Sequence, residues 1–305
     1  MAKSAAPYGS WPSPITTDLV LSSAVSLGDL SVSHSGRAVA WTEGRPEEKG
    51  RNALVYQHLS GSAKQEQVLP DVKWNARSRV HEYGGAPWTF ESDSSILFSS
   101  FDGPAFRVER GEDGSWGEPK QVTPASSVLR FADFAPHSSQ KGVTLAVVED
   151  HTEDKPSTVV NTLGVISSDS NGPTLHTVAS GADFYASPRW SPSGQFLTWV
   201  QWNHPDMPWE GSELWVAKVA RDSSGSLNLS QLVEPGSAVK VAGALRNVES
   251  VSQPRWALPS EDGTAPDKLV FLSDRTGFYE LYVFEPEGDK EVKLLLKEPT
   301  GADVG

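Results

Sequence analysis

The chain of 305 residues contains no cysteine, no long apolar run and no excess of basic residues. Without cysteine there are no disulfides, thiolate metal sites or cysteine nucleophiles, and a reducing compartment is allowed, so we expect a cytoplasmic protein. No stretch approaches the roughly 18 apolar residues of a membrane helix, and the first residues lack the apolar run of a secretory signal. A net charge of −13 opposes binding to a phosphate backbone. We therefore expect neither a membrane nor a nucleic acid as a partner.

What the chain does have is a repeated strand pattern. Short apolar or alternating runs are separated by Gly, Pro, Ser and Asp, which is typical of β-strands and tight turns. About five times, a short strand, a turn and a strongly apolar strand follow one another, most clearly around Ser187–Gly194. The five predicted strand pairs are Leu30–Val32 with Ala38–Thr42, Pro87–Phe90 with Ile96–Ser100, Phe131–Phe134 with Thr144–Glu149, Pro188–Trp190 with Phe196–Trp202, and Pro254–Trp256 with Lys268–Ser273.

A third strand and a weaker, polar fourth strand complete each repeat. The fourth strands are expected to end before Pro70, Pro124, Ser180, Pro235 and Pro299. Four strands in about fifty residues predict an all-β protein, a β-propeller of four-stranded blades with about five blades present. We expect one domain over 1–305, with repeats at about 25–70, 71–124, 125–180, 181–236 and 237–300, and the start of a sixth at 301–305. A β-sandwich of hairpins is the alternative, but it gives no reason for one order to recur five times.

Three stretches are more specific than a generic blade. They are Arg79–Gly85 (RVHEYGG), Trp202–Trp209 (WNHPDMPW) and Ser273–Tyr282 (SDRTGFYELY). Together they resemble the N-terminal propeller of the prolyl oligopeptidase family of serine peptidases, in the branch of acylaminoacyl-peptidases and dipeptidyl aminopeptidases. The third pattern occurs in many propellers, whereas the first two are long enough to be distinctive. The resemblance covers essentially the whole chain.

The resemblance implies about seven blades followed by an α/β-hydrolase domain with a Ser-Asp-His triad. This chain reaches about five blades, and the Gly-x-Ser-x-Gly turn that carries the hydrolase nucleophile occurs nowhere in it. We therefore expect a truncated form with no catalytic residue, no cofactor and no metal site. The resembling family consists of hydrolases that act in proteolysis, but this chain is expected to be inactive alone. A triad assembled on another backbone stays open, because triads are recognised by geometry.

The motifs also give the candidate site. Connections in a four-stranded blade alternate between its two faces, so all three motifs are expected on one face, near the mouth of the central tunnel. The candidate residues for substrate gating or binding are Arg77, Arg79, His81, Glu82, Tyr83, Trp202, His204, Met207, Trp209, Asp274 and Arg275. The resemblance implies that this face covers a hydrolase active site and restricts which peptides enter it.

Each candidate has a functional and a structural interpretation. In the functional interpretation, Glu82 binds a substrate's charged amino terminus, and the nearby arginines are forked donors to a carboxylate or to a partner domain. In the structural interpretation, Glu82 braces Arg79 in an ion pair. The Trp202–Trp209 stretch forms either an apolar wall for a ligand or a proline-stiffened loop packed on the next blade. Asp274 and Arg275 favour a bracing pair. The polar run at 149–154 is predicted to be a solvated loop.

The leading hypothesis is a gating and substrate-selecting propeller of a serine peptidase, whose partners are an α/β-hydrolase domain and peptide substrates. The alternatives are a stand-alone small propeller that binds or transforms a small molecule in its central cavity, and a platform for protein interactions.

Overall fold

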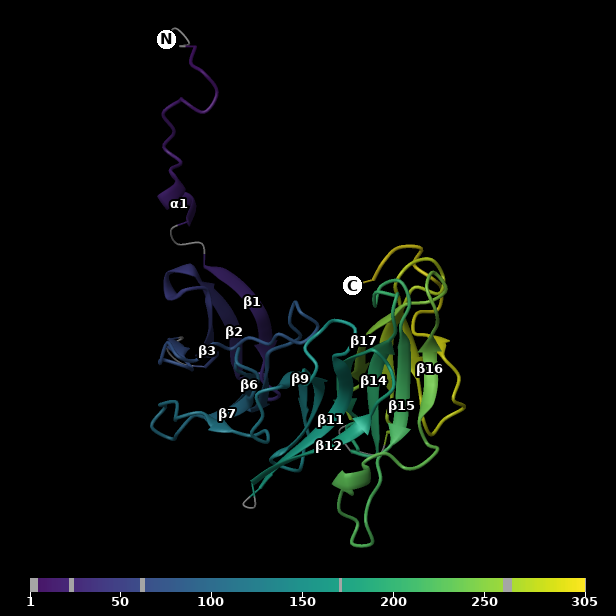
Figure 1. The fold of residues 1–305 in the computed structure, drawn as a ribbon. Coiled ribbons are helices and arrows are strands. Elements are labelled where there is room, and N and C mark those ends of the chain that lie inside the picture. Colours follow the sequence, from purple (N-terminus) through teal and green to yellow (C-terminus); the bar gives the residue numbers. More distant parts are fainter. Residues whose placement is uncertain (1–4, 22–24, 61–63, 170–171, 260–264, 305) are drawn as a thin grey trace. The chain divides into compact units, whose positions relative to one another are not determined.

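A computed structural model describes residues 5–21, 25–60, 64–169, 172–259 and 265–304. Its strands form five four-stranded antiparallel sheets, each built from four strands consecutive in the sequence (Figure 1). The all-β propeller architecture predicted from the repeat is confirmed. A short helix, α1 (Thr17–Leu21), precedes the first sheet. Within the described residues, no helix is long and apolar enough to cross a membrane.

The chain divides into two compact units, residues 1–76 and 77–305. The first unit holds the sheet of β1 (Ser26–Val32), β2 (Ala38–Arg45), β3 (Arg51–His58) and β4 (Gln65–Gln67). The second holds the sheet of β5 (Trp88–Ser92), β6 (Ser95–Ser99), β7 (Ala105–Glu109) and β8 (Lys120–Gln121), and that of β9 (Leu129–Pro136), β10 (Val143–Asp150), β11 (Val160–Asp169) and β12 (Gly172–Ala179). Its last two sheets contain β13 (Phe184–Trp190), β14 (Phe196–Trp202), β15 (Glu213–Lys218) and β16 (Val239–Gly243), then β17 (Val251–Trp256), β18 (Leu269–Ser273), β19 (Glu280–Phe284) and β20 (Lys293–Leu294).

Apolar layers between neighbouring sheets hold the second unit together. In β10, Leu145 and Val147 pack toward the β13–β16 sheet, whereas Ala146 and Val148 pack toward the β5–β8 sheet. This is the two-residue period of a strand with both faces buried, and it explains why the second strands are so strongly apolar in sequence. The first strands β5, β9, β13 and β17 lie against one another in this order.

The fourth strand of the fourth sheet lies later in the chain than predicted. It was expected before Pro235, but β16 is Val239–Gly243. The preceding segment folds back on itself instead, through isolated bridges between Val219 and Val233 and between Arg221 and Leu227, and a short 3₁₀ helix, η2 (Leu229–Gln231). From this hairpin Leu227 and Leu232 pack into the core, and the chain joins the sheet only after it.

Four of the five first strands carry a bulge at a corresponding place. The residues in the left-handed region are Asp29 in β1, Asp133 in β9, Ser187 in β13 and Gln253 in β17, with φ between 50° and 57°. At each of them the register with the second strand shifts. A bulge bends a strand and re-aims the side chains around it.

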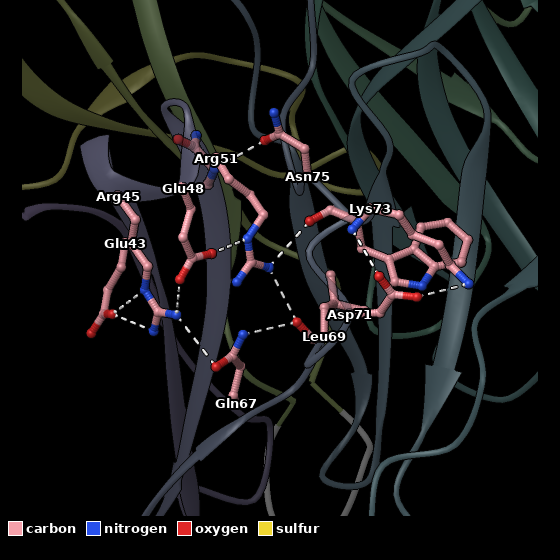
Figure 2. A network of polar contacts seen from close by, with 11 residues as sticks. Glu43, Arg45, Glu48, Arg51, Gln67, Leu69, Asp71, Lys73 and Asn75 are labelled. Atoms are coloured by element: carbon pink, nitrogen blue, oxygen red, sulfur yellow. Dashed lines mark hydrogen bonds and ion pairs between the residues drawn. The ribbon is translucent and has the colours of Figure 1, made fainter.

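A polar network connects the sheet of the first unit to the segment that follows it (Figure 2). Arg51, with only 3 % of its side chain exposed, is paired with Glu48 in the turn η1 (Pro46–Glu48). Its Nη1 donates to the carbonyl oxygens of Leu69 and Trp74, at 3.1 and 3.2 Å. Arg51 therefore ties the β2–β3 connection to the segment that leaves β4.

Candidate functional site

The Arg79–Gly85 motif forms a tight turn before β5. His81 and Glu82 are consecutive non-glycine residues in the left-handed region, at φ 58° and 65°. The N–H of Gly84 donates to the carbonyl of Val80 at 2.8 Å. Gly84 has φ 94°, and a Cβ there would lie 2.9 Å from the carbonyl oxygen of Ser78, so this position needs glycine. Two adjacent residues in a costly conformation persist only where their surroundings fix them.

The buried residue that fixes this turn is Glu149, near the end of β10. Its Oε1 accepts the backbone N–H of His81 at 2.7 Å, and its Oε2 lies 3.0 Å from Nε2 of His151. The other ring nitrogen of His151 lies 2.7 Å from a carboxylate oxygen of Asp154, and this bond lowers the pKa of Asp154. Glu149, His151 and Asp154 thus form a carboxylate–imidazole–carboxylate chain from the turn to the surface.

The prediction of a solvated loop at 149–154 was therefore wrong for Glu149 and His151, which are 2 % and 6 % exposed. The sequence held a signal for this. Glu149 and His151 continue the alternation of Leu145 and Val147, so they point to the same side of the strand as these two residues, which pack toward the β13–β16 sheet.

The turn and the Trp202–Trp209 loop meet at a cavity of about 260 Å³ that we call the turn–loop pocket. Its lining residues are His81, Glu82, Tyr83, Glu149, His151, Pro156, Ser157, Val159, Asn161, Asp183, Phe184, Trp202, His204, Asp206 and Met207. Phe184 and Trp202 stack with centroids 5.2 Å apart, and the ring of His81 meets both edge-on at 5.5 Å. His204 approaches Phe184 edge-on at 4.8 Å. The pocket thus has an aromatic wall.

The charged lining of the pocket is acidic. It includes four carboxylates and three imidazoles, with no lysine or arginine. Burial lowers the pKa of His81, against the raising effect of Glu149 and Asp133, which favours the neutral form of its ring. Burial and the charge of Glu149 raise the pKa of Tyr83. The electrostatics favour a cationic group over an anion.

Two polar atoms in this lining are buried and have no hydrogen-bond partner among the residues that the structure describes. They are Oδ1 of Asn161 and Nε2 of His81. Asn161 is only 5 % exposed and lies opposite Glu149 in the pairing of β10 with β11. Because unpaired buried polar groups are costly and rare, they point to a partner that occupies the space in front of them.

Six of the candidate residues line this pocket: His81, Glu82, Tyr83, Trp202, His204 and Met207. The other five lie outside its lining. Arg77 and Arg79 have their guanidinium carbons 5.5 and 5.0 Å from the ring centroid of Phe101, and Arg79 makes no ion pair with Glu82 in the described part of the chain. Trp209 is 62 % exposed.

Asp274 and Arg275 act at a distance from the pocket. The carboxylate of Asp274 accepts the N–H of Ser250 at 2.7 Å, and the Ser250 hydroxyl donates to the carbonyl of Pro208 in the loop. Arg275 donates to the carboxylate of Glu249 through Nε and Nη2, at 2.9 and 2.6 Å. Asp274 thus connects the next sheet to the loop through Ser250, whereas Arg275 braces Glu249.

The sequence analysis did not single out Asn161 and Phe184. Phe184 opens β13, where an aromatic residue is common in any blade. Asn161 occurs in a polar stretch before an apolar strand, and only its pairing with Glu149 brings it into the pocket.

The fold and this pocket define a class: a β-propeller with a ligand-sized cavity beside its first strands. No family model and no curated protein matches the chain. Solved structures do. Puromycin hydrolase is 30 % identical with a TM-score of 0.76, and the match covers 97 % of this chain and 43 % of that one. A puromycin-hydrolyzing peptidase of Mycobacterium tuberculosis is 30 % identical with a TM-score of 0.71, covering 97 % and 41 %.

On this similarity, the chain belongs to the prolyl oligopeptidase family and corresponds to the propeller part of the longer relatives. The family predicted from the three motifs is confirmed. The chain spans less than half the length of these relatives. An oligogalacturonate lyase of Vibrio parahaemolyticus, 12 % identical with a TM-score of 0.57 over 88 % of this chain and 64 % of that one, shares the fold alone.

Proposed function

We propose that this propeller is the gating and substrate-selecting part of a serine peptidase, and that the turn–loop pocket holds the amino end of a peptide. The partner in this proposal is an α/β-hydrolase domain of the kind that completes the family. We further propose that the propeller alone does not hydrolyse peptides and works in the cytoplasm.

The observation that carries the proposal is the chemistry of the pocket. The carboxylate of Glu82 has no partner among the described residues, and it lies beside an aromatic wall in a lining without lysine or arginine. A protonated amine could satisfy Glu82 and donate to Oδ1 of Asn161. The faces of Trp202 and Tyr83 suit both a cation and an apolar side chain.

The test is calorimetric binding of an unblocked tripeptide to the chain, beside the same peptide acetylated at its amino terminus. We expect the unblocked peptide to bind at least tenfold more tightly, because acetylation removes the charge. Glu82→Gln is expected to remove most of this preference. Glu234→Gln, an exposed residue between β15 and β16, is the matched control and is expected to leave it intact.

Equal affinity for the two peptides, or an unchanged preference in Glu82→Gln, would contradict the proposal. Incubation of either peptide with the chain is expected to give no cleavage. Turnover that a serine-directed inhibitor abolishes would overturn the assignment of a non-catalytic domain.

A further inference from the structure

A second group of charged residues lies on the first strands, outside the turn–loop pocket. The sequence Pro-Arg-Trp occurs at 188–190 in β13 and again at 254–256 in β17. Both copies follow the left-handed bulge residue, and Arg189 and Arg255 both pair with the second strand directly after the register shift. The two arginines therefore occupy corresponding positions on neighbouring sheets.

Hydrogen bonds hold the two strands together at this level. Nε1 of Trp256 donates to the carbonyl of Arg189 at 3.4 Å, just as Nε1 of Trp190 donates to the carbonyl of Ala135 at 2.9 Å. Nη1 of each arginine donates to the carbonyl of its own preceding proline, at 2.6 Å for Arg189 and 2.9 Å for Arg255. Both guanidinium groups are thus held in a matching way, and their remaining N–H groups make no hydrogen bond to another described residue.

The charge at this place is not balanced. The nearest carboxylate is that of Asp133, whose Oδ1 lies 3.8 Å from Nη2 of Arg189 and whose Oδ2 accepts the N–H of Ser187 at 2.8 Å. Arg255 makes no ion pair within the described ranges. Burial and the charge of Arg189 lower the pKa of Arg255, against the opposing effect of Asp133. Two like charges face one carboxylate, which is unfavourable unless an anion joins them.

There is space next to this group. A cavity of about 230 Å³ is lined by the bulge residues Asp133, Ser187 and Gln253. Ser187 and Gln253 precede Arg189 and Arg255 by two residues on β13 and β17, and the arginines themselves lie just outside the lining. The cavity and the two arginines therefore lie close to each other along β13 and β17.

We propose that Arg189 and Arg255 form an anion site, which takes a carboxylate or phosphate group on the side of the molecule where β9, β13 and β17 meet. Forked N–H donors on two arginines match the oxygens of either group. Asp133 acts as the internal counter-ion that an incoming anion replaces. The adjacent cavity shares His81, Tyr83 and Trp202 with the turn–loop pocket, whereas the two arginines lie outside both linings. The proposal does not depend on the function proposed for that pocket.

The test is a titration of the chain with inorganic phosphate and, separately, with acetate, at constant ionic strength, followed by calorimetry. We expect Arg189→Gln and Arg255→Gln each to weaken binding at least fivefold. Arg37→Gln, an exposed arginine of the first unit, is the control and is expected to bind as the unchanged chain does.

Asp133→Asn is expected to change the anion affinity in the opposite direction to the arginine variants. Asparagine tolerates the left-handed backbone and still accepts the N–H of Ser187 through its amide oxygen, so the fold is retained. Removal of the competing carboxylate is expected to tighten anion binding at least threefold. If the unchanged chain binds neither anion, if both arginine variants bind as it does, or if Asp133→Asn weakens binding, the proposal is wrong. If the proposal holds, tighter binding of phosphate or of acetate identifies which of the two anions the site takes.

Discussion

The backbone N–H of His81 donates to the buried carboxylate of Glu149 at 2.7 Å, and this bond joins two parts of the chain that are 68 residues apart. His81 begins the pair of left-handed residues in the turn, each of which costs on the order of 1–3 kcal/mol. A charged acceptor on a backbone N–H contributes about 1.5–3 kcal/mol. One carboxylate can therefore offset much of the strain that presents Glu82 and Tyr83 to the pocket.

Glu149→Gln is expected to lower the free energy of unfolding by about 2 kcal/mol, because the charged acceptor becomes neutral and the contact with His151 is disturbed. Urea unfolding measures the loss, and hydrogen exchange at the amide of His81 reports it locally. Glu153→Gln, an exposed carboxylate in the same loop, is the control. Unchanged exchange at His81 in Glu149→Gln would show that the turn is held by other means.

The strands of this fold were predictable because they depend on local pattern. The apolar residues of β10 and β14 alternate between two neighbouring sheets, and such runs can be recognised without knowing their partners. The position of β16 was not predictable in this way. The turn residues near Pro235 favour a strand boundary there, whereas the apolar residues Leu227 and Leu232 pack in the core before the chain reaches the sheet.

The site was predictable only in part, for a related reason. The motifs identified both walls of the pocket, His81–Tyr83 and Trp202–Met207, because each wall is one contiguous segment of the sequence. Its floor comes from Glu149, His151 and Asn161, whose roles depend on pairing between β10 and β11 and on a contact with a distant turn. Polar residues in a charged stretch usually face water, whereas Glu149 and His151 continue a strand that is buried on both faces and point to the side of Leu145 and Val147.

Gly84→Ala tests the close approach in the turn. The substitution places a methyl group 2.9 Å from the carbonyl oxygen of Ser78 and adds the strain of a left-handed residue, so we expect a loss of about 2–3 kcal/mol in the free energy of unfolding. The matched control is Gly181→Ala, which has φ 102° and open space around the new Cβ. Its expected loss is about 1 kcal/mol. Equal losses in a urea titration would mean that the contact with Ser78 does not matter.

Glu249 predicts a specific dependence of stability on pH. Burial raises its pKa, but hydrogen bonds from Ser273, Arg275 and the N–H of Gly243 outweigh it, and the folded pKa lies below the ordinary value of 4.5. A carboxyl with a depressed folded pKa stabilises the protein above its unfolded pKa, and this stabilisation is lost as the pH falls through the folded value.

Glu249→Gln is accordingly expected to cost about 2 kcal/mol in the free energy of unfolding at pH 7. The difference from the unchanged chain is expected to shrink once the pH falls below the ordinary value of 4.5. Urea unfolding at both ends of this range measures it, with the exposed Glu298→Gln as control. A difference that stays constant with pH would rule out the ionised carboxylate as its source.

Arg51→Met tests the network of the first unit. The change keeps an apolar stem but leaves Glu48 and the carbonyl oxygens of Leu69 and Trp74 without their donor. Loss of a buried charged partner costs about 3 kcal/mol, so faster hydrogen exchange is expected throughout β3. Lys64→Met, an exposed residue ahead of β4, is expected to change nothing. Exchange in β3 that matches the control would show that the guanidinium contributes little.

Asn161→Val separates stability from binding. Because Oδ1 of Asn161 is buried without a partner, its replacement by a similar apolar side chain is expected to leave the free energy of unfolding unchanged or raise it by up to about 1 kcal/mol. If the pocket holds an amine through this oxygen, the same variant binds the unblocked tripeptide at least tenfold more weakly. Thr162→Val, at the next position of β11 and on the opposite face of the strand, is the control. A residue that lowers stability while it improves binding is selected for its ligand, whereas lost stability with unchanged binding would assign Asn161 to the core.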